Sequence, residues 1–292
     1  MATAGAPIEL AALTLILALI GGLFPIFSKI KENPDTLRRI TGIASGILLA
    51  SALLVVVPEG FELATEEHEE AEHEEEAEHE EEAEHEEEGV GNLLIGGAVL
   101  AGFLVMLILE GSGIGHAVHE EHHDHHDEHG HEHVHHRSSP WIIVLGLSLH
   151  SAADGLAIGS AAAGTSEAVT ALVALAVLIH KVPAAFSLGV FSMHEREDRN
   201  DSIRDIVMFS LATPVMILVS FYTLQGMDEH LIALAMLFAA GTFLYVATVD
   251  TLPDIHNPET GREALRNVLI GVVVLVLLLY GAEAAGLIEH GH

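Results

Sequence analysis

The chain has 292 residues, half of them hydrophobic, and a formal net charge of −32 from 43 acidic and 11 basic residues. This acidic balance excludes a nucleic-acid-binding protein, and the absence of cysteine excludes a disulfide framework and a thiolate metal site. Long uncharged runs alternate with short polar links, which is typical of a multi-pass membrane protein.

The apolar runs predict eight membrane-spanning helices of about 17–25 residues, the length that crosses a hydrocarbon core of about 30 Å. The predicted spans are residues 8–28, 43–63, 93–109, 141–163, 169–193, 203–224, 231–252 and 265–287. We therefore expect an all-α fold in which residues 1–292 form a single membrane domain.

Basic residues are confined to alternate loops. Ten of the eleven lie in or beside the odd-numbered loops, and the eleventh, Lys181, lies inside the fifth span. Because cytoplasmic loops carry the excess of Lys and Arg, we predict that the odd-numbered loops are cytoplasmic and that both termini lie outside. The expected location is the cell membrane.

Two loops have a low-complexity composition that cannot bury a core, so we expect both to be mobile. Loop 64–90, predicted outside, repeats Ala-Glu-His-Glu-Glu-Glu from Ala71, Ala77 and Ala83 and contains sixteen glutamates. Loop 111–140, predicted cytoplasmic, holds eleven histidines between His116 and His136. The histidines favour metal binding in the cytoplasmic loop. In the outer loop, metal binding and simple electrostatic attraction of cations remain open.

Ionisable side chains interrupt two of the apolar runs: His150 and Asp154 in the fourth span, and His180 and Lys181 in the fifth. Such residues are costly inside a bilayer and by default indicate a functional site. His150 and Asp154 are four residues apart and therefore share a helix face. Counted from the turn between the spans, the two histidines differ in depth by about 3 Å, so we predict a shared cation site.

An internal repeat relates the same segments. A glycine precedes a proline-acidic pair by twelve residues in spans two and seven, and a histidine precedes a glycine by nine in spans four and five. These pairs are Gly46 with Pro58, Gly241 with Pro253, His150 with Gly159, and His180 with Gly189. The members run in opposite directions, which predicts an inverted repeat with a substrate site near the midplane. Helix–helix hydrogen bonds and a structural Asp154–Lys181 ion pair are the simpler alternative.

Two motifs resemble a known family. Residues 150–155 read His-Ser-Ala-Ala-Asp-Gly and resemble the signature His-Asn/Ser-x-x-Asp/Glu-Gly of the ZIP (Zrt/Irt-like) divalent metal transporters. Residues 180–185 read His-Lys-Val-Pro-Ala-Ala and match that family's His-Glu-x-Pro-His-Glu only in part, as in the subgroup with Lys in place of the first Glu. The resemblance implies uptake of zinc or a similar ion into the cytoplasm, an elevator-type motion and a homodimer in the lipid bilayer.

The resemblance also implies that members with complete motifs hold two adjacent metals, and this chain departs from them at Lys181 and Ala184. We therefore predict one transported metal bound by His150, Asp154 and His180, with the Lys181 ammonium in place of the second cation. Imidazole and carboxylate ligands suit zinc best, and also iron, manganese or cadmium. The metal is expected as transported substrate rather than as a resident cofactor.

Four further residues are candidates for a second site or a transport pathway. Ser151 lies within the span-four motif, Glu59 at the outer end of span two, and Asp250 and Asp254 near the inner end of span seven. Ordinary carboxylates at helix ends are the alternative for Glu59.

An enzyme, a metal sensor and a permease of another family are the alternatives to a ZIP-type transporter. An intramembrane metalloprotease would need His-Glu-x-x-His, but Lys181 and Ala184 occupy the required places, so no enzyme is expected. A membrane metal sensor without transport and a cation permease of another family remain open alternatives.

Overall fold

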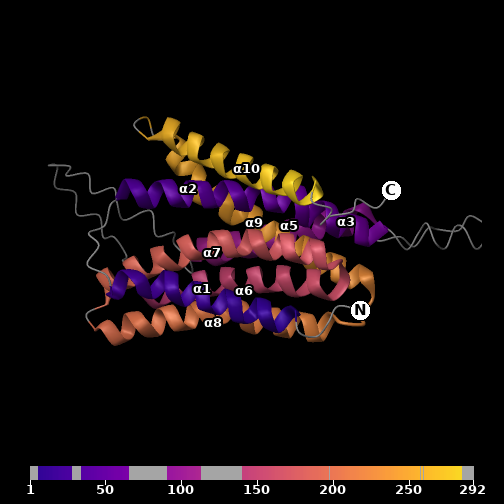
Figure 1. The fold of residues 1–292 in the computed structure, drawn as a ribbon, viewed down its shortest axis with the longest axis horizontal. Coiled ribbons are helices and arrows are strands. Elements are labelled where there is room, and N and C mark those ends of the chain that lie inside the picture. Colours follow the sequence, from indigo (N-terminus) through magenta and orange to yellow (C-terminus); the bar gives the residue numbers. More distant parts are fainter. Residues whose placement is uncertain are drawn as a thin grey trace, which may run out of the picture.

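The structure is a computed structural model that describes residues 6–27, 34–65, 91–112, 140–196, 198–256, 258 and 260–284. The described chain is helical (Figure 1). Its elements are α1 (Ala6–Phe27), α2 (Pro34–Ser51), a π-helical turn η1 (Ala52–Val56), α3 (Val57–Thr65), α5 (Asn92–Gly111), α6 (Pro140–Gly164), α7 (Glu167–Glu195), α8 (Arg199–Leu224), α9 (Glu229–His256) and α10 (Gly261–Ala284).

Each of the eight predicted spans coincides with a helix. The second span corresponds to α2, η1 and α3 together, which follow one another without a break. Seven of these helices are long and apolar enough to cross a membrane, and the eighth, α6, has 25 residues and carries His150 and Asp154. The all-α, multi-pass class is therefore confirmed. The orientation of the loops and termini stays a prediction.

The helices form two bundles. The first bundle contains α1, α6, α7 and α8, and the second contains α2, α3, α5, α9 and α10. Figure 1 shows the first bundle below α2 and α10. The two bundles meet mainly where α6 packs on α9 and α2 packs on α7, so the helices that carry the candidate site also form the boundary between bundles.

Glycines allow helix backbones to touch inside each bundle, as small residues do in membrane helix pairs. A Cβ added at any of these glycines would meet a carbonyl or side-chain oxygen of the facing helix. The crossings are Gly46 on Val268 and Gly271 on Ile43 (α2 and α10), Gly102 on Phe238 and Gly241 on Val99 (α5 and α9), Gly189 on Gly22 (α7 and α1), and Gly155 on Thr213 and Gly159 on Ser220 (α6 and α8). Between the bundles, the nearest atoms to such a Cβ at Gly164 are side-chain atoms of Ile232.

The second predicted span is locally distorted. At η1 the Val57 N–H bonds to the Ala52 carbonyl, five residues back, and Pro58 follows immediately. Such π-turns widen a helix and often mark functional positions.

Several sequence predictions concern segments outside the described residues. Apart from their edges, the acidic repeat loop 64–90 and the histidine-rich loop 111–140 are among these, and so are the side chains of Asp250 and Asp254 in α9.

Candidate metal site

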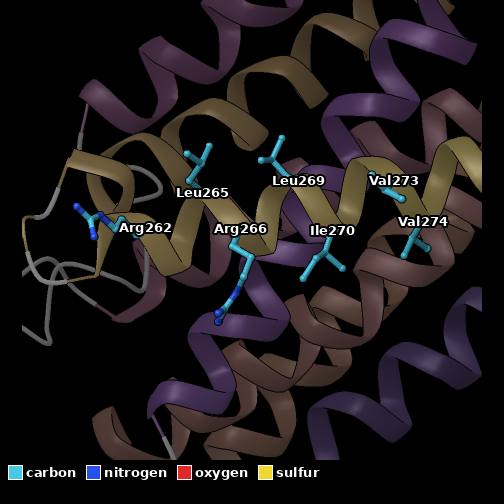
Figure 2. A pocket seen from close by; sticks show the side chains of 7 residues that line it. All are labelled: Arg262, Leu265, Arg266, Leu269, Ile270, Val273 and Val274. Carbon is cyan, nitrogen blue, oxygen red and sulfur yellow. The ribbon is translucent and has the colours of Figure 1, made fainter.

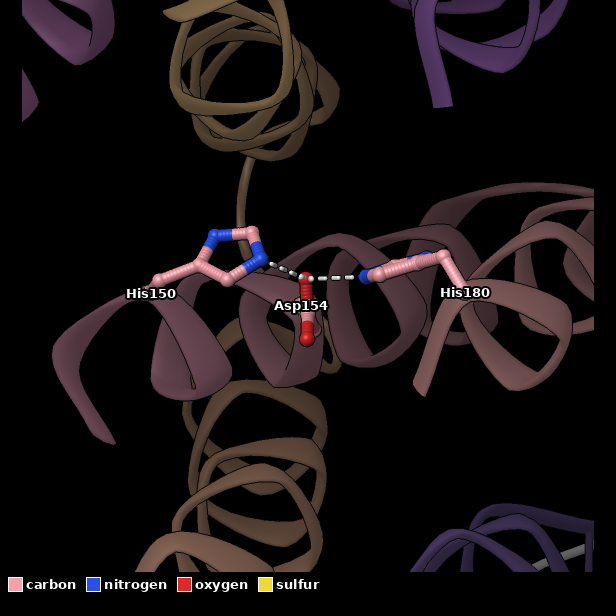
Figure 3. Close-up of side chains that lie close together, drawn as sticks. All are labelled: His150, Asp154 and His180. Carbon is pink, nitrogen blue, oxygen red and sulfur yellow. Dashed lines mark ion pairs between the residues drawn. The ribbon is translucent and has the colours of Figure 1, made fainter. Parts of the chain in front are cut away.

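Three potential metal ligands converge where α6 packs against α7 (Figure 3). His150 and Asp154 come from successive turns of α6, and His180 comes from α7; each is no more than 5% exposed. The two histidines flank the carboxylate, with Asp154 Oδ1 lying 3.7 Å from His150 Nε2 and 3.3 Å from His180 Nε2. One ligand atom from each residue lies within 4.8 Å of the other two. This is the only such cluster in the part of the chain that the structure describes.

The hydrogen bonding of His180 fixes which nitrogen faces the cluster. Its Nδ1 lies 3.0 Å from the carbonyl of Ala176, one turn earlier in α7, and a carbonyl can only accept. Nδ1 therefore carries a proton, and a neutral ring presents the Nε2 lone pair to Asp154. A backbone acceptor behind a histidine is the usual way of orienting it as a metal ligand.

The facing atoms have no hydrogen-bond partner. Asp154 Oδ1 and His180 Nε2 are both buried without one, although unsatisfied buried polar groups are costly. A lone pair and a carboxylate oxygen 3.3 Å apart repel each other unless a cation or proton lies between them. The arrangement is therefore suited to a positively charged ligand.

The other oxygen of Asp154 faces Lys181. The Lys181 ammonium, which is fully buried, lies 3.0 Å from Asp154 Oδ2. It also donates to the Ser151 hydroxyl and lies 4.5 Å from the centre of the Phe209 ring. The carboxylate is thus divided, with Oδ2 bound to a fixed cation and Oδ1 directed to the two histidines.

Residues of α8 hold this lysine in place. Thr213 Oγ1 donates to the Ser151 carbonyl at 2.7 Å, and the Ser151 hydroxyl donates to the Phe209 carbonyl at 3.1 Å. Sequence reasoning missed Phe209 and Thr213, since neither is unusual in an apolar span. Pro214, next to Thr213 inside α8, is the one sequence feature that could have directed attention there.

A third missed residue comes from the second bundle. Phe243 of α9 is fully buried, and its ring centre lies 6.2 Å from that of His180 in an edge-on arrangement. The wall of the cluster on this side is therefore apolar and belongs to the other bundle.

The other predicted site residues lie in different parts of the structure. Ser151 and Lys181 lie beside the cluster. Glu59 is half-buried in the first turn of α3 and is not among the three clustered ligands. Asp250 and Asp254 belong to α9, and their side chains lie outside the described residues.

Fold and site together define a multi-pass helical membrane protein with a buried two-histidine, one-carboxylate cluster between two of its helices. Comparison with known sequences specifies the class further. The family model described as ZIP Zinc transporter matches residues 5–139 and 111–282, and the chain belongs to this family.

The curated relatives of the chain are also named as zinc transporters. The chain is 33% identical over 265 residues to Zinc transporter ZIP9 of Xenopus tropicalis, covering 83% of this chain and 84% of the relative. It is 33% identical over 287 residues to Zinc transporter ZIP9 of Micropogonias undulatus, covering 88% and 89%. Zinc transporter ZIP9 of Macaca fascicularis is 40% identical over 148 residues, 46% of this chain and 63% of the relative. Members of this family are transporters, so the chain is a metal transporter family member rather than an enzyme.

Proposed function

We propose that the protein carries zinc across the cell membrane into the cytoplasm through a site formed by His150, Asp154 and His180. One observation carries the proposal: the buried donor cluster between α6 and α7 in a member of a zinc transporter family. Zinc prefers nitrogen and oxygen ligands in fourfold coordination, and three protein ligands leave one position for water. An exchangeable position suits an ion that must enter and leave. The same ligands can accept iron, manganese or cadmium.

The proposed orientation has the odd-numbered loops in the cytoplasm and both termini outside. It rests on the basic residues, ten of which flank those loops. In this orientation the histidine-rich loop 111–140 would buffer incoming metal, and the acidic loop 64–90 would gather it outside.

Glycine packing supports the proposed inverted repeat. Gly46 joins α2 to α10, and its repeat partner Gly241 joins α9 to α5. Likewise Gly189 joins α7 to α1, and its partner Gly159 joins α6 to α8. An inverted repeat would relate the first three spans to the last three, and α6 to α7. Such a repeat maps the α2–α10 crossing onto the α9–α5 crossing, and the α7–α1 crossing onto the α6–α8 crossing.

The two bundles suggest how the ion crosses. The closest glycine contacts, such as Gly46 on Val268 and Gly102 on Phe238, are backbone contacts within a bundle, whereas Gly164 faces a side chain of the other bundle. Side-chain contacts also occur within the bundles, as at Gly60 on Leu237. We propose that the first bundle moves as a body along the second and carries the metal with it, as in an elevator-type transporter. A homodimer would hold the second bundles together.

We further propose that Lys181 takes the place of a second metal, so that one ion is transported per protomer. The ammonium bound to Asp154 Oδ2 supplies the positive charge that a second cation would bring. Ser151 completes this position. Glu59, Asp250 and Asp254 are proposed as pathway residues at the two ends of the route.

Metal stoichiometry tests the role of Lys181. Lys181→Glu should raise the metal count per protomer above that of the wild type, because a carboxylate replaces the fixed cation. Lys181→Met removes the charge without adding a ligand and is the matched control. Anomalous scattering gives the count and the positions, and an unchanged count in Lys181→Glu would contradict the proposal.

Radioactive zinc uptake into proteoliposomes tests the transport site. His150→Ala and His180→Ala should each lower uptake to the level of protein-free vesicles. His194→Ala is the matched control, since His194 lies about 21 Å further along α7. Zinc binding without uptake in the wild-type protein would favour a metal sensor over a transporter.

A further inference from the structure

An open groove of about 520 Å³ runs along the outward face of α10, in the second bundle (Figure 2). Its lining residues recur every three or four positions and therefore share one helix face. They are Arg262, Leu265, Arg266, Leu269, Ile270, Val273 and Val274. The five apolar members are each more than a third exposed, so this face is available to the surroundings of the helix.

The groove is basic at one end. Arg262 and Arg266 lie in the first two turns of α10, and Figure 2 shows them at one end of the row, with Val273 and Val274 at the other. Arg39 of α2 lies beside them, because Arg39 Nε and an Arg266 amino group both contact Glu263 Oε1, at 2.7 and 3.1 Å. Of the described charged residues named at this end, three are arginines and one is a glutamate, in a chain whose net charge is −32.

We propose that this groove binds an anionic phospholipid, with its phosphate at Arg262 and Arg266 and an acyl chain along the apolar row. The planar guanidinium group donates paired hydrogen bonds that match phosphate oxygens. From Leu265 to Val274 the helix rises about 14 Å, close to half of a hydrocarbon core of about 30 Å. The groove therefore matches the depth of one leaflet.

Charge favours an anionic phospholipid in this groove over a zwitterionic lipid or a second copy of the chain. A zwitterionic lipid would fill the apolar row but would not offset the excess of arginine. A second copy of the chain related by a twofold axis along the membrane normal would bring its own arginines to the same depth, where like charges repel. In the proposed orientation the basic end faces the cytoplasmic leaflet, which carries the anionic lipids. The site is independent of the metal cluster.

Native mass spectrometry of the full-length protein in detergent tests the proposal, with phosphatidylglycerol and phosphatidylcholine as probes. Wild-type protein should prefer phosphatidylglycerol, and each of Arg262→Gln and Arg266→Gln should lower that preference about fivefold. Arg204→Gln should leave it unchanged; this control residue is 49% exposed on α8 and pairs with Asp201.

Two further variants separate lipid binding from a folding defect. The Arg262→Lys/Arg266→Lys protein should keep most of the preference, because the charge remains. Ile270→Trp should weaken phosphatidylglycerol binding by filling the groove, with the arginines intact. Equal binding of the two lipids by the wild type, or an unchanged preference in both the Arg262→Gln and the Arg266→Gln protein, would overturn the proposal. Displacement of the lipid by millimolar inorganic phosphate would show that the phosphate alone is recognised, which would overturn the proposed binding of the acyl chain along the apolar row.

Discussion

The two bundles bury different kinds of residues. Among the side chains that the structure describes, which leave out Asp250 and Asp254 of α9, the buried charged ones all belong to the first bundle: Asp154, Lys181 and Asp205. The second bundle is buried mainly through aliphatic and aromatic side chains and the glycine crossings of α2 with α10 and α5 with α9. A charged group inside a membrane protein needs fixed partners, whereas an apolar support needs only close packing. The difference agrees with the proposed roles, in which the first bundle binds the ion and the second supports it.

Polar contacts also join the helices of the first bundle at the ends where loop five connects α7 and α8. Asp205 of α8 accepts hydrogen bonds from Arg196 at 2.8 and 3.1 Å and from the Ser192 hydroxyl at 2.7 Å. Arg196 lies 5.0 Å from the centre of the Trp141 ring in α6, and Arg199 lies 4.2 Å from that of Phe27 in α1. All four helices are connected in this way, which favours movement of the bundle as one body.

The largest expected effect comes from fixing one bundle to the other. In a Gly164→Cys/Ile232→Cys protein the two Cβ atoms would lie near the 3.3 Å that separates a Gly164 Cβ from Ile232 Cβ, close to the range of about 3.5–4.5 Å found in disulfides. Oxidation should reduce zinc uptake to background, because the bundles can no longer move, and reduction should restore it. The chain contains no cysteine, so no other thiol interferes.

A disulfide inside the first bundle is the matched control. In Gly21→Cys/Ala185→Cys the corresponding Cβ separation is 3.4 Å, between α1 and α7. Uptake should survive oxidation in this protein, since both helices move together. Full uptake by the oxidised Gly164→Cys/Ile232→Cys protein would refute relative movement of the bundles.

A smaller effect is expected from breaking the buried ion pair. Asp154→Ala leaves the Lys181 ammonium buried without its counterion, which should lower the free energy of unfolding by about 3–5 kcal/mol. Asp154→Ala/Lys181→Met should recover most of this loss, because no buried charge remains. Denaturant unfolding in detergent measures both.

A surface ion pair provides the comparison for this effect. Asp201→Ala removes a carboxylate 3.3 Å from Arg204 where both side chains are nearly half exposed, and it should change stability by less than about 1 kcal/mol. If Lys181→Met failed to rescue Asp154→Ala, the loss would come from packing rather than from the unpaired charge.

The sequence predicted what depends on spacing within a helix, such as the shared face of His150 and Asp154 and the length of the spans. It did not predict partners that depend on which helices pack together. Thr213 and Phe209 reach Ser151 and Lys181 because α8 crosses α6 and α7 here, and Phe243 faces His180 because α9 lies across the bundle boundary. Helix ends were also underestimated: the helix that contains the second span, predicted over residues 43–63, begins at Pro34 and ends at Thr65, since helical hydrogen bonding extends beyond the apolar run.

The smallest expected effect concerns the glycines. Gly102→Ala adds a Cβ that would meet the Phe238 carbonyl and, at 3.2 Å, the Thr242 nitrogen. Because backbone atoms cannot move aside, α5 must shift from α9, and we expect a loss of about 1–3 kcal/mol, as for overpacking in general. At Gly164 the added Cβ meets Ile232 Cγ2 at 2.7 Å and Cδ1 at 3.1 Å, and a side chain can change rotamer, so Gly164→Ala should cost less.

Gly97→Ala is the baseline, because open space surrounds that position and alanine favours the helix by about 1 kcal/mol. Thermal unfolding should rank stability as Gly97→Ala, Gly164→Ala, Gly102→Ala, from highest to lowest. Equal losses in the last two would mean that the boundary between the bundles is packed as rigidly as the bundles themselves, which would leave the first bundle no low-cost way to move.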